Sequence, residues 1–146
     1  MNEISICVSK GHKTTANILK RKAFTVSMAE AGQVVACDYV GIVSGNKVAD
    51  KFARAGFHAT RSEFVDAPLI DELSVAMECR LKDYNPETSI LRGEIVNVSV
   101  DERVLGENGK VDASKVVPII FDPFNNDYLK VGEKVGNAFS DGKILK

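Results

Sequence analysis

The residues that could do chemistry in this 146-residue chain gather in one short segment, which reads Lys10-Gly11-His12-Lys13-Thr14-Thr15. Two lysines, an imidazole and two hydroxyls would converge there where a helix begins, and the helix N-terminus adds free N–H groups and partial positive charge. Gly11 would let a ligand approach the backbone closely, and a phosphate would accept several charge-assisted hydrogen bonds at once. The segment predicts an anion site, although the same residue types are common on solvated loops.

The other chemistry-bearing side chains favour structural roles. We expect His58 to be a partly buried, hydrogen-bonded histidine rather than an acid or base, and we expect Asp66, Asp71 and Glu72 to be loop and surface charges. Neither His58 nor His12 has a second ligand at a usual metal spacing, so no metal site is predicted. The sequence contains no G-x-S-x-G elbow and no G-x-G-x-x-G motif, so it does not indicate acyl transfer by a serine elbow or dinucleotide binding by a Rossmann fold.

Composition is that of an ordinary globular domain. The 19 basic side chains nearly balance the 20 acidic ones, so the net charge does not indicate a nucleic acid partner. The length suits one domain over residues 1–146, and no apolar run approaches the roughly 20 residues that cross a membrane. Without a signal-peptide pattern, the expected location is the cytoplasm. Cys7, Cys37 and Cys79 are widely spaced, and we expect buried or half-buried thiols.

Two strands must position the basic segment. Apolar residues alternate over Ile4–Ser9 and again over Phe24–Met28, which predicts a strand on each side of it. Between them, Thr14–Lys22 is predicted to be a short helix, capped by Thr14 or Thr15, with basic residues in its last turn. The basic segment would therefore connect a strand to a helix.

Helices are predicted next, over 33–43 and, after the Ser44-Gly45-Asn46 break, over 47–55, with Gly56 ending the second. Asp66-Ala67-Pro68 predicts an extended or turn segment. Two longer strands follow, over 75–82 and 90–100, with a turn at 83–86.

The apolar phase of the 90–100 strand changes after Ile95, which predicts a bulge or a bend. Beyond it we expect a turn at 106–109, a helical turn at 112–115, a short strand at 118–121 and a tail of little periodicity from Tyr128. These elements describe one α+β domain, mostly antiparallel sheet, with helices inserted between strands.

The order of several sequence blocks resembles the flavin reductase-like, FMN-binding family, and flavoredoxins are its most similar members. The blocks that carry this resemblance are Ile4–His12, Asp38–Gly45 with Lys47–Phe52, Asp66–Ile70, Gly93–Val96, and Leu129–Gly136 with Ala138-Phe139-Ser140. The resemblance covers nearly the whole chain. It implies a split β-barrel of the flavin reductase type, a homodimer, and one FMN per subunit near the dimer interface.

The resemblance also implies roles at single positions. Lys10 and His12 would supply charge or donors to the FMN phosphate, Thr14 a hydroxyl, and Gly11 and Thr15 backbone N–H groups. The loop 38–45 would approach the isoalloxazine or the partner subunit, or would simply be a helix end packed on the barrel.

Two departures from the family pattern limit what can be transferred. Family members usually have a cysteine where Val40 stands, so no thiol chemistry is expected there. They also usually carry roughly 40 further residues before the strand that matches 4–9, and without those strands a sheet edge would be exposed and part of the FMN site missing.

The activity implied is that of an FMN-binding oxidoreductase, which passes electrons from NAD(P)H or a protein donor to a flavin, iron or electron-carrier acceptor. Because the cofactor carries such chemistry, no catalytic side chain is predicted. Two alternatives remain: an FMN-binding electron carrier without nicotinamide turnover, and a flavin-free dimerisation module.

Overall fold

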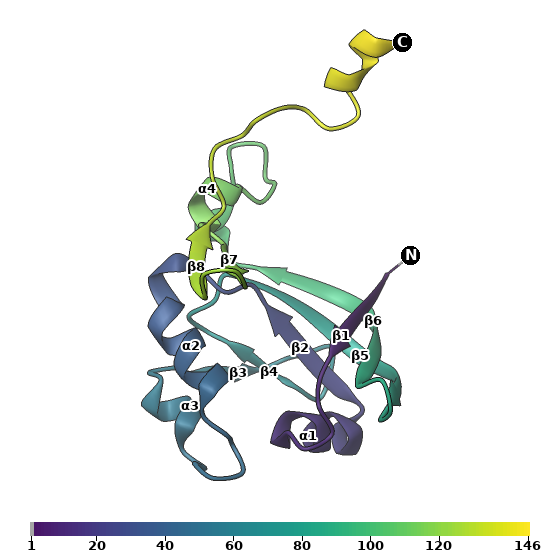
Figure 1. The fold of residues 1–146 in the computed structure, drawn as a ribbon, viewed down its shortest axis with the longest axis vertical. Coiled ribbons are helices and arrows are strands. Elements are labelled where there is room, and N and C mark those ends of the chain that lie inside the picture. Colours follow the sequence, from purple (N-terminus) through teal and green to yellow (C-terminus); the bar gives the residue numbers. More distant parts are fainter. Residues whose placement is uncertain (1) are drawn as a thin grey trace.

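A computed structural model describes residues 2–146, and its main element is a four-stranded antiparallel sheet of order β1-β6-β5-β2 (Figure 1). The sheet strands are β1 (Glu3–Cys7), β2 (Ala23–Ser27), β5 (Val75–Asn85) and β6 (Ile90–Val100). Two small hairpins are formed by β3 (Ala59–Arg61) with β4 (Pro68–Ile70) and by β7 (Ile119–Asp122) with β8 (Asp127–Lys130). The helices are α1 (Lys13–Arg21), α2 (Val34–Ile42), α3 (Lys51–Arg54) and α4 (Ala113–Val116), with 3-10 turns at Ala31–Gln33, Glu102–Val104 and Asp141–Leu145.

The long β5–β6 hairpin is the centre of the sheet. Its register shifts opposite Glu78 and Cys79, which pair with Asn97 and Ile95, so Val96 is the extra residue of a bulge. This confirms the bend that the change of apolar phase predicts. The predicted turn at 83–86 is wrong in its start, because β5 continues to Asn85, whose side chain then accepts bonds from the next two backbone N–H groups of the turn.

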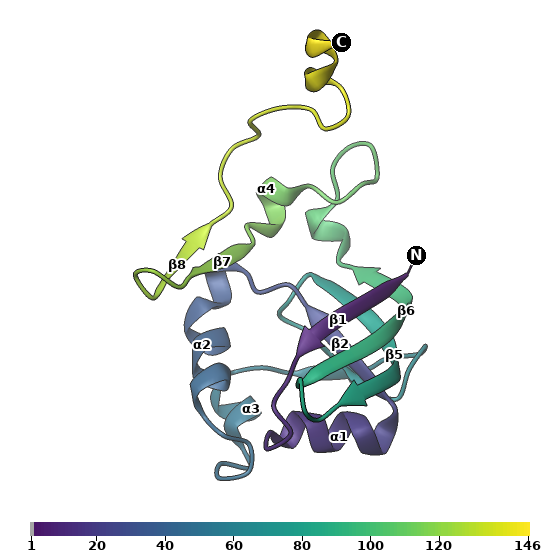
Figure 2. The same ribbon diagram turned by 45° about the vertical axis from the view of Figure 1, so that its right-hand side comes forward.

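One face of the sheet packs on α1, which lies beneath it in Figure 2. Ile18 of α1 meets Phe24, Cys79 and Leu91 from three strands in one buried cluster. The ring of Phe24 lies over Gly93, where an added Cβ would stand 2.5 Å from Phe24 Cζ. A side chain at position 93 would therefore force this ring out of the core.

The opposite face carries a buried carboxylate. Glu78 on β5 is fully buried, and its oxygens accept hydrogen bonds from the Ser62 hydroxyl, the Asn97 amide and the Ser99 hydroxyl. Ser62 Oγ also accepts the backbone N–H groups of residues 64 and 65, each at 3.0 Å. The loop after β3 is thus fixed to the sheet through Glu78.

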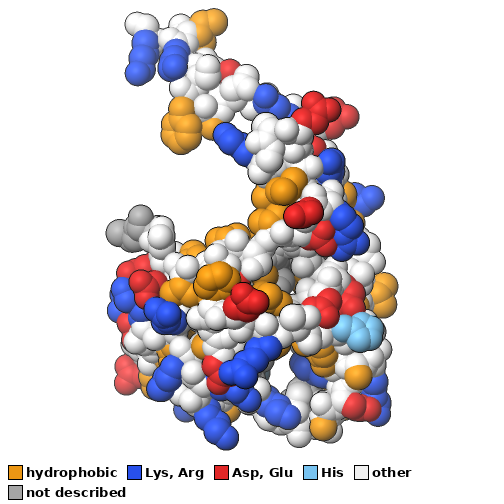
Figure 3. Space-filling model, turned by 180° about the vertical axis from the view of Figure 1, so that it is seen from behind, with side chains coloured by type: hydrophobic (Ala, Val, Ile, Leu, Met, Phe, Trp, Pro, Cys, Tyr) orange, Lys and Arg blue, Asp and Glu red, His pale blue; other side chains and the backbone are white. Residues whose placement is uncertain are grey.

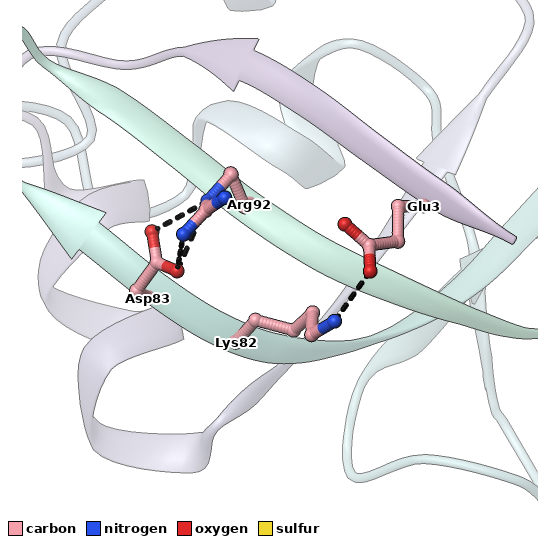
Figure 4. A network of polar contacts seen from close by, with 4 residues as sticks. All are labelled: Glu3, Lys82, Asp83 and Arg92. Atoms are coloured by element: carbon pink, nitrogen blue, oxygen red, sulfur yellow. Dashed lines mark hydrogen bonds and ion pairs between the residues drawn. The ribbon is translucent and has the colours of Figure 1, made fainter. Parts of the chain in front are cut away.

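The exposed surface of the same sheet carries two ion pairs, shown in Figure 4. Lys82 pairs with Glu3 and so links β5 to β1, while Arg92 on β6 pairs with Asp83 on β5. All four side chains are largely solvated, so these pairs favour the register without contributing much to stability.

The second predicted helix is shorter than expected. The segment 47–55 is helical only over α3, because residues 44–48 form turns in which Lys47 N and Val48 N both donate to Ser44 O. Gly56 ends α3 with a φ of 76°, as predicted. The first helix of this pair, predicted over 33–43, is confirmed as α2.

The C-terminal part leaves the body. After α4 and the β7–β8 hairpin, residues 131–146 extend away from the sheet and end in a short 3-10 turn (Figures 1 and 2). The predicted strand at 118–121 is confirmed as β7, whereas β8 lies partly in the tail that shows no periodicity.

The burial of the three cysteines and the character of the helices can be compared with the sequence predictions. Cys79 is buried and Cys37 half-buried, but Cys7 is exposed, so the expectation for Cys7 is wrong, since it lies on the solvent side of an edge strand. Within residues 2–146, no helix combines the length and the apolar character needed to cross a membrane.

Candidate functional site

The basic segment lies where the sequence predicts it, between β1 and α1. The turn is closed by His12 N, which donates to Ser9 O at 3.1 Å. The helix begins at Lys13, so its N-cap residue is His12 and not a threonine. The predicted threonine cap is wrong because Thr14 and Thr15 both lie inside the first turn of the helix, where the Thr15 hydroxyl donates to Ser9 O at 2.7 Å.

The first turn of α1 offers hydrogen-bond donors to solvent. Lys10, Gly11, His12 and Thr14 are exposed, whereas Thr15 is buried. Within residues 2–146, the backbone N–H groups of positions 13–15 have no acceptor. Unpaired N–H groups at a helix start carry partial positive charge and attract anions. The predicted residues lie together in one turn, and the hydroxyl of the buried Thr15 is directed to Ser9 O inside the fold.

A second loop, residues 44–47, packs against this turn. Asn46 Nδ2 donates to Gly11 O at 3.0 Å, and the backbone of Gly45 lies against the side chain of Lys13. The loop also brings the exposed Lys47, and in the described part of the chain none of Lys10, Lys13 and Lys47 is paired with a carboxylate. Three unneutralised ammonium groups thus belong to two touching loops.

The position of the second loop depends on Lys51. Its Nζ donates to Val40 O at 2.8 Å and to Val43 O at 2.9 Å, at the end of α2 where the last carbonyls of a helix lack partners. The stem of Lys51 lies beside Gly45. Sequence reasoning missed Asn46, Lys47 and Lys51, because the Ser-Gly-Asn break indicates a turn but not the neighbour on which that turn packs.

A cavity of about 880 Å³ adjoins the first turn of α1. Of the predicted site residues only Thr14 lines it. The other lining residues come from β1, α1, β2, β3, the loop before β4 and the first residue of β4. Arg21 and Arg61 stand at this cavity with a single carboxylate, Asp66, between them at 2.8 and 3.6 Å. The size is that of a small-molecule site, and the walls mix apolar and polar groups.

His58 is not among the residues that line the cavity, although the next residue, Ala59, is. Its ring Nδ1 is 2.6 Å from Glu72 Oε1, and this hydrogen bond and the charge of Glu72 raise the pKa of His58 above 6.5. The expected hydrogen bond is confirmed, but the expected partial burial is wrong, since four fifths of the side chain is exposed. Asp66 is the surface charge that was expected, paired with arginines.

The arrangement can bind an anion and contains no acid–base or nucleophile pair of its own. Within residues 2–146, no three of the His, Cys, Asp and Glu side chains are grouped to hold a metal ion. The donors gathered at the turn are N–H groups, ammonium groups, an imidazole and a hydroxyl. Such a set recognises phosphate better than it performs chemistry.

Comparisons with known proteins show which family this chain is similar to. Residues 3–121 match the family model of the flavin reductase like domain. An uncharacterized protein of Aquifex aeolicus is 32% identical over 108 residues, which are 73% of this chain and 55% of the relative. The chain thus spans about half the length of the curated relative it matches.

Solved structures give the same result. A flavoredoxin of Desulfovibrio vulgaris is 39% identical, with a TM-score of 0.89 over 96% of this chain and 75% of that one. A flavoredoxin from Methanosarcina acetivorans is 31% identical, with a TM-score of 0.89 over 99% and 76%. A split-barrel flavin reductase-like protein of Shewanella frigidimarina, at 18% identity, has a TM-score of 0.73 over 92% and 69%, which shows the shared fold. The expected fold class, α+β and mostly β with the split barrel, is confirmed.

Proposed function

Because the chain belongs to the flavin reductase-like family, we propose that it binds FMN and serves as an oxidoreductase, taking electrons from NAD(P)H or a protein donor. The acceptor would be a flavin, iron or an electron carrier. We also propose that it works as a homodimer. The observation that carries the proposal is the cluster of unneutralised donors at the start of α1.

The FMN phosphate fits the donor set of the turn. Lys10, His12 and Thr14 would donate from exposed side chains. The N–H of Gly11 donates to Ser9 Oγ over a long 3.4 Å, and it would exchange this acceptor for the phosphate. The N–H groups at positions 13–15 would complete the cradle, since a phosphate has more acceptor oxygens than one side chain can satisfy. The buried Thr15 hydroxyl holds the turn in place through Ser9 O.

The second loop would support the same phosphate. Asn46 donates to the carbonyl of Gly11, and this hydrogen bond ties the second loop to the turn. Lys13 and Lys47 add positive charge on either side. These lysines neutralise an anion without moving protons, which suits a site that binds rather than catalyses.

The bound flavin would supply the electron-transfer chemistry, as cofactors do in such proteins. The chain's own residues would bind and orient it. No proton transfer by a side chain of this turn is required.

The test is an FMN titration followed by flavin fluorescence and visible absorbance. The full chain should bind with a dissociation constant below about 100 μM, the affinity that two or three charge-assisted bonds can supply. The double variant Lys10→Ala/His12→Ala should bind at least tenfold more weakly. Lys20→Ala, which removes a lysine from the other end of α1, is the matched control and should bind as the unmodified chain does.

Two results would contradict the proposal. Unaltered FMN affinity in the double variant would mean that the phosphate binds elsewhere, and no binding by the unmodified chain would favour a flavin-free dimerisation module. Steady-state oxidation of NADH and NADPH then separates the remaining pair. Flavin binding without turnover would indicate an electron carrier rather than a reductase.

A further inference from the structure

The surface around helix α1 carries more positive charge than a single phosphate needs. No Asp or Glu occurs at positions 4–29. That stretch contains five basic side chains besides His12, which are Lys10, Lys13, Lys20, Arg21 and Lys22. The chain as a whole has a net charge of −1, so its acidic groups are concentrated elsewhere. In Figure 3 the Lys and Arg side chains gather on the lower part of the body, where α1 and α3 lie in Figure 1.

The lysines of this surface are not neutralised within the chain. Arg21 is paired with Asp66 at 2.8 Å, but over residues 2–146 none of the lysines of α1 and its flanks forms an ion pair. The loop 44–47 packs against the start of α1, so Lys47 belongs to the same surface. We call the exposed set the lysine face, and its members are Lys10, Lys13, Lys20, Lys22 and Lys47.

The lysine face is longer than the phosphate turn. Lys13 and Lys20 are seven residues apart on α1, so they lie on the same side of the helix and about 10 Å apart along its axis. The exposed Ala16 and Asn17 share that side, and their small side chains leave the helix surface between the lysines open. A phosphate held at the turn cannot also contact Lys20 or Lys22. The far end of the lysine face can therefore serve a second anionic partner.

The composition of the lysine face favours an acidic protein as that partner. Within the described residues no exposed Phe or Tyr lies on α1 or on the loop 44–47, so the face has no platform on which bases could stack. The apolar side of α1 is buried against the sheet, so this helix cannot enter a membrane surface as basic amphipathic helices do. Electron-transfer complexes, in contrast, have small interfaces, below about 1,200 Å², and complementary charges bring such partners together. A charged face about one short helix long matches that class.

We propose that the lysine face is the docking surface for a small acidic electron-transfer protein. That the partner carries electrons rests on the proposed function, whereas its acidic character rests on the lysines. Helix α1 belongs both to the lysine face and to the phosphate turn, so a partner docked along its nine residues would lie within about 13 Å of the flavin phosphate. The positive charge would also speed the approach of an acidic partner, because complementary charges steer association.

Binding of two acidic carriers, a plant-type [2Fe–2S] ferredoxin and a flavodoxin, tests the docking surface. Each carrier is labelled with a fluorophore and titrated with the full chain, and the anisotropy gives the dissociation constant. At least one carrier should bind, and Lys20→Gln/Lys22→Gln should weaken that binding about three- to tenfold, the loss expected for two surface ion pairs. Added salt should weaken it too, because exposed charges are screened. Lys134→Gln/Lys143→Gln is the matched control, since it removes the same charge from exposed positions of the C-terminal segment and should leave the binding unchanged. Far-ultraviolet circular dichroism checks that both variants are folded.

An FMN titration of the same variants keeps the docking surface separate from the flavin site. Lys20→Gln/Lys22→Gln should bind FMN as the unmodified chain does, since neither lysine reaches the phosphate turn. If a carrier binds through these lysines but the chain does not bind FMN, the docking surface stands and the proposed function fails. Carrier binding that is absent, insensitive to salt or equal in the two double variants would overturn the docking surface. So would tighter binding of a single-stranded DNA of about 20 nucleotides, which would assign the lysine face to nucleic acid.

Discussion

Replacing Glu78 by glutamine should destabilise the fold by a predictable route. Glu78 accepts from Ser62 on one oxygen and from Asn97 and Ser99 on the other, so its oxygens act only as acceptors. A glutamine must turn its NH₂ group toward one side. Turned toward Ser62, it meets a hydroxyl oxygen that already accepts two backbone N–H groups.

The magnitude follows from that conflict. A buried donor left without an acceptor costs about 1–3 kcal/mol, and the loss of charge assistance adds to it, so we expect about 2–4 kcal/mol of lost unfolding free energy at pH 7. For a chain of this length that is roughly 6–12 °C in Tm. Urea unfolding at fixed temperature measures it. Glu94→Gln, the same change at an exposed position of β6, is the control and should change stability by less than about 0.5 kcal/mol.

The loss of stability caused by Glu78→Gln should be smaller at low pH than at neutral pH. Burial opposes ionisation of Glu78 and raises its pKa, but the hydrogen bonds from Ser62, Ser99 and Asn97 outweigh burial and leave the pKa below 4.5. A lowered folded-state pKa gives stability that is complete above pH 4.5 and is lost as pH falls through the folded value. The difference between the unmodified chain and Glu78→Gln should therefore be smaller at an acidic pH well below 4.5 than at pH 7. An equal difference at both pH values, or none at pH 7, would refute the reasoning.

Two other substitutions probe the packing that supports the site. Gly93→Ala would place a Cβ 2.5 Å from the Phe24 ring and 3.2 Å from a backbone oxygen, so we expect the free energy of unfolding in urea to fall by about 1–3 kcal/mol. Gly32→Ala is the control and should be near neutral, because a Cβ there meets nothing within 4 Å. A neutral result for both variants would refute the clash. Lys51→Met would leave two carbonyls at the end of α2 without their donor and loosen the loop against the α1 turn. We expect the free energy of unfolding to fall by about 1–2 kcal/mol and FMN to bind more weakly. If the free energy of unfolding does not fall, the two hydrogen bonds do not contribute to stability.

The sequence was sufficient where a residue's environment is set by its near neighbours in the chain. Alternation over β1, β2, β5 and β6 indicated each strand, because every second side chain must face the core. The change of apolar phase at Val96 located a bulge, since an extra residue reverses that alternation. The basic turn was also readable, because a strand end and a helix start bring six consecutive residues together.

The sequence predictions were wrong where a residue makes a hydrogen bond to a part of the chain that lies outside its own helix or turn. Thr15 has the residue type of an N-cap, but the helix begins before it, and its buried hydroxyl donates to Ser9 O once β1 and α1 have packed. The helix predicted over 47–55 loses its first half to the turns at 44–48, where Lys47 N and Val48 N donate to Ser44 O and Asn46 donates to Gly11 O of the α1 turn. Differences in helix propensity are a few tenths of a kcal/mol per residue, whereas one hydrogen bond within the folded protein contributes about 1 kcal/mol to stability.

The sequence by itself therefore determined the four strands of the main sheet and the turn of residues 10–15 between β1 and α1, for which we propose anion binding. Only the tertiary structure placed the loop of Asn46 and Lys47 against that turn, buried Glu78 beneath the loop of Ser62, and left α2 and the arm uncovered. The physical reason is the range of the interactions. Periodicity and helix starts are set within a few residues, whereas a hydrogen bond between residues 35 positions apart exists only after the chain has folded.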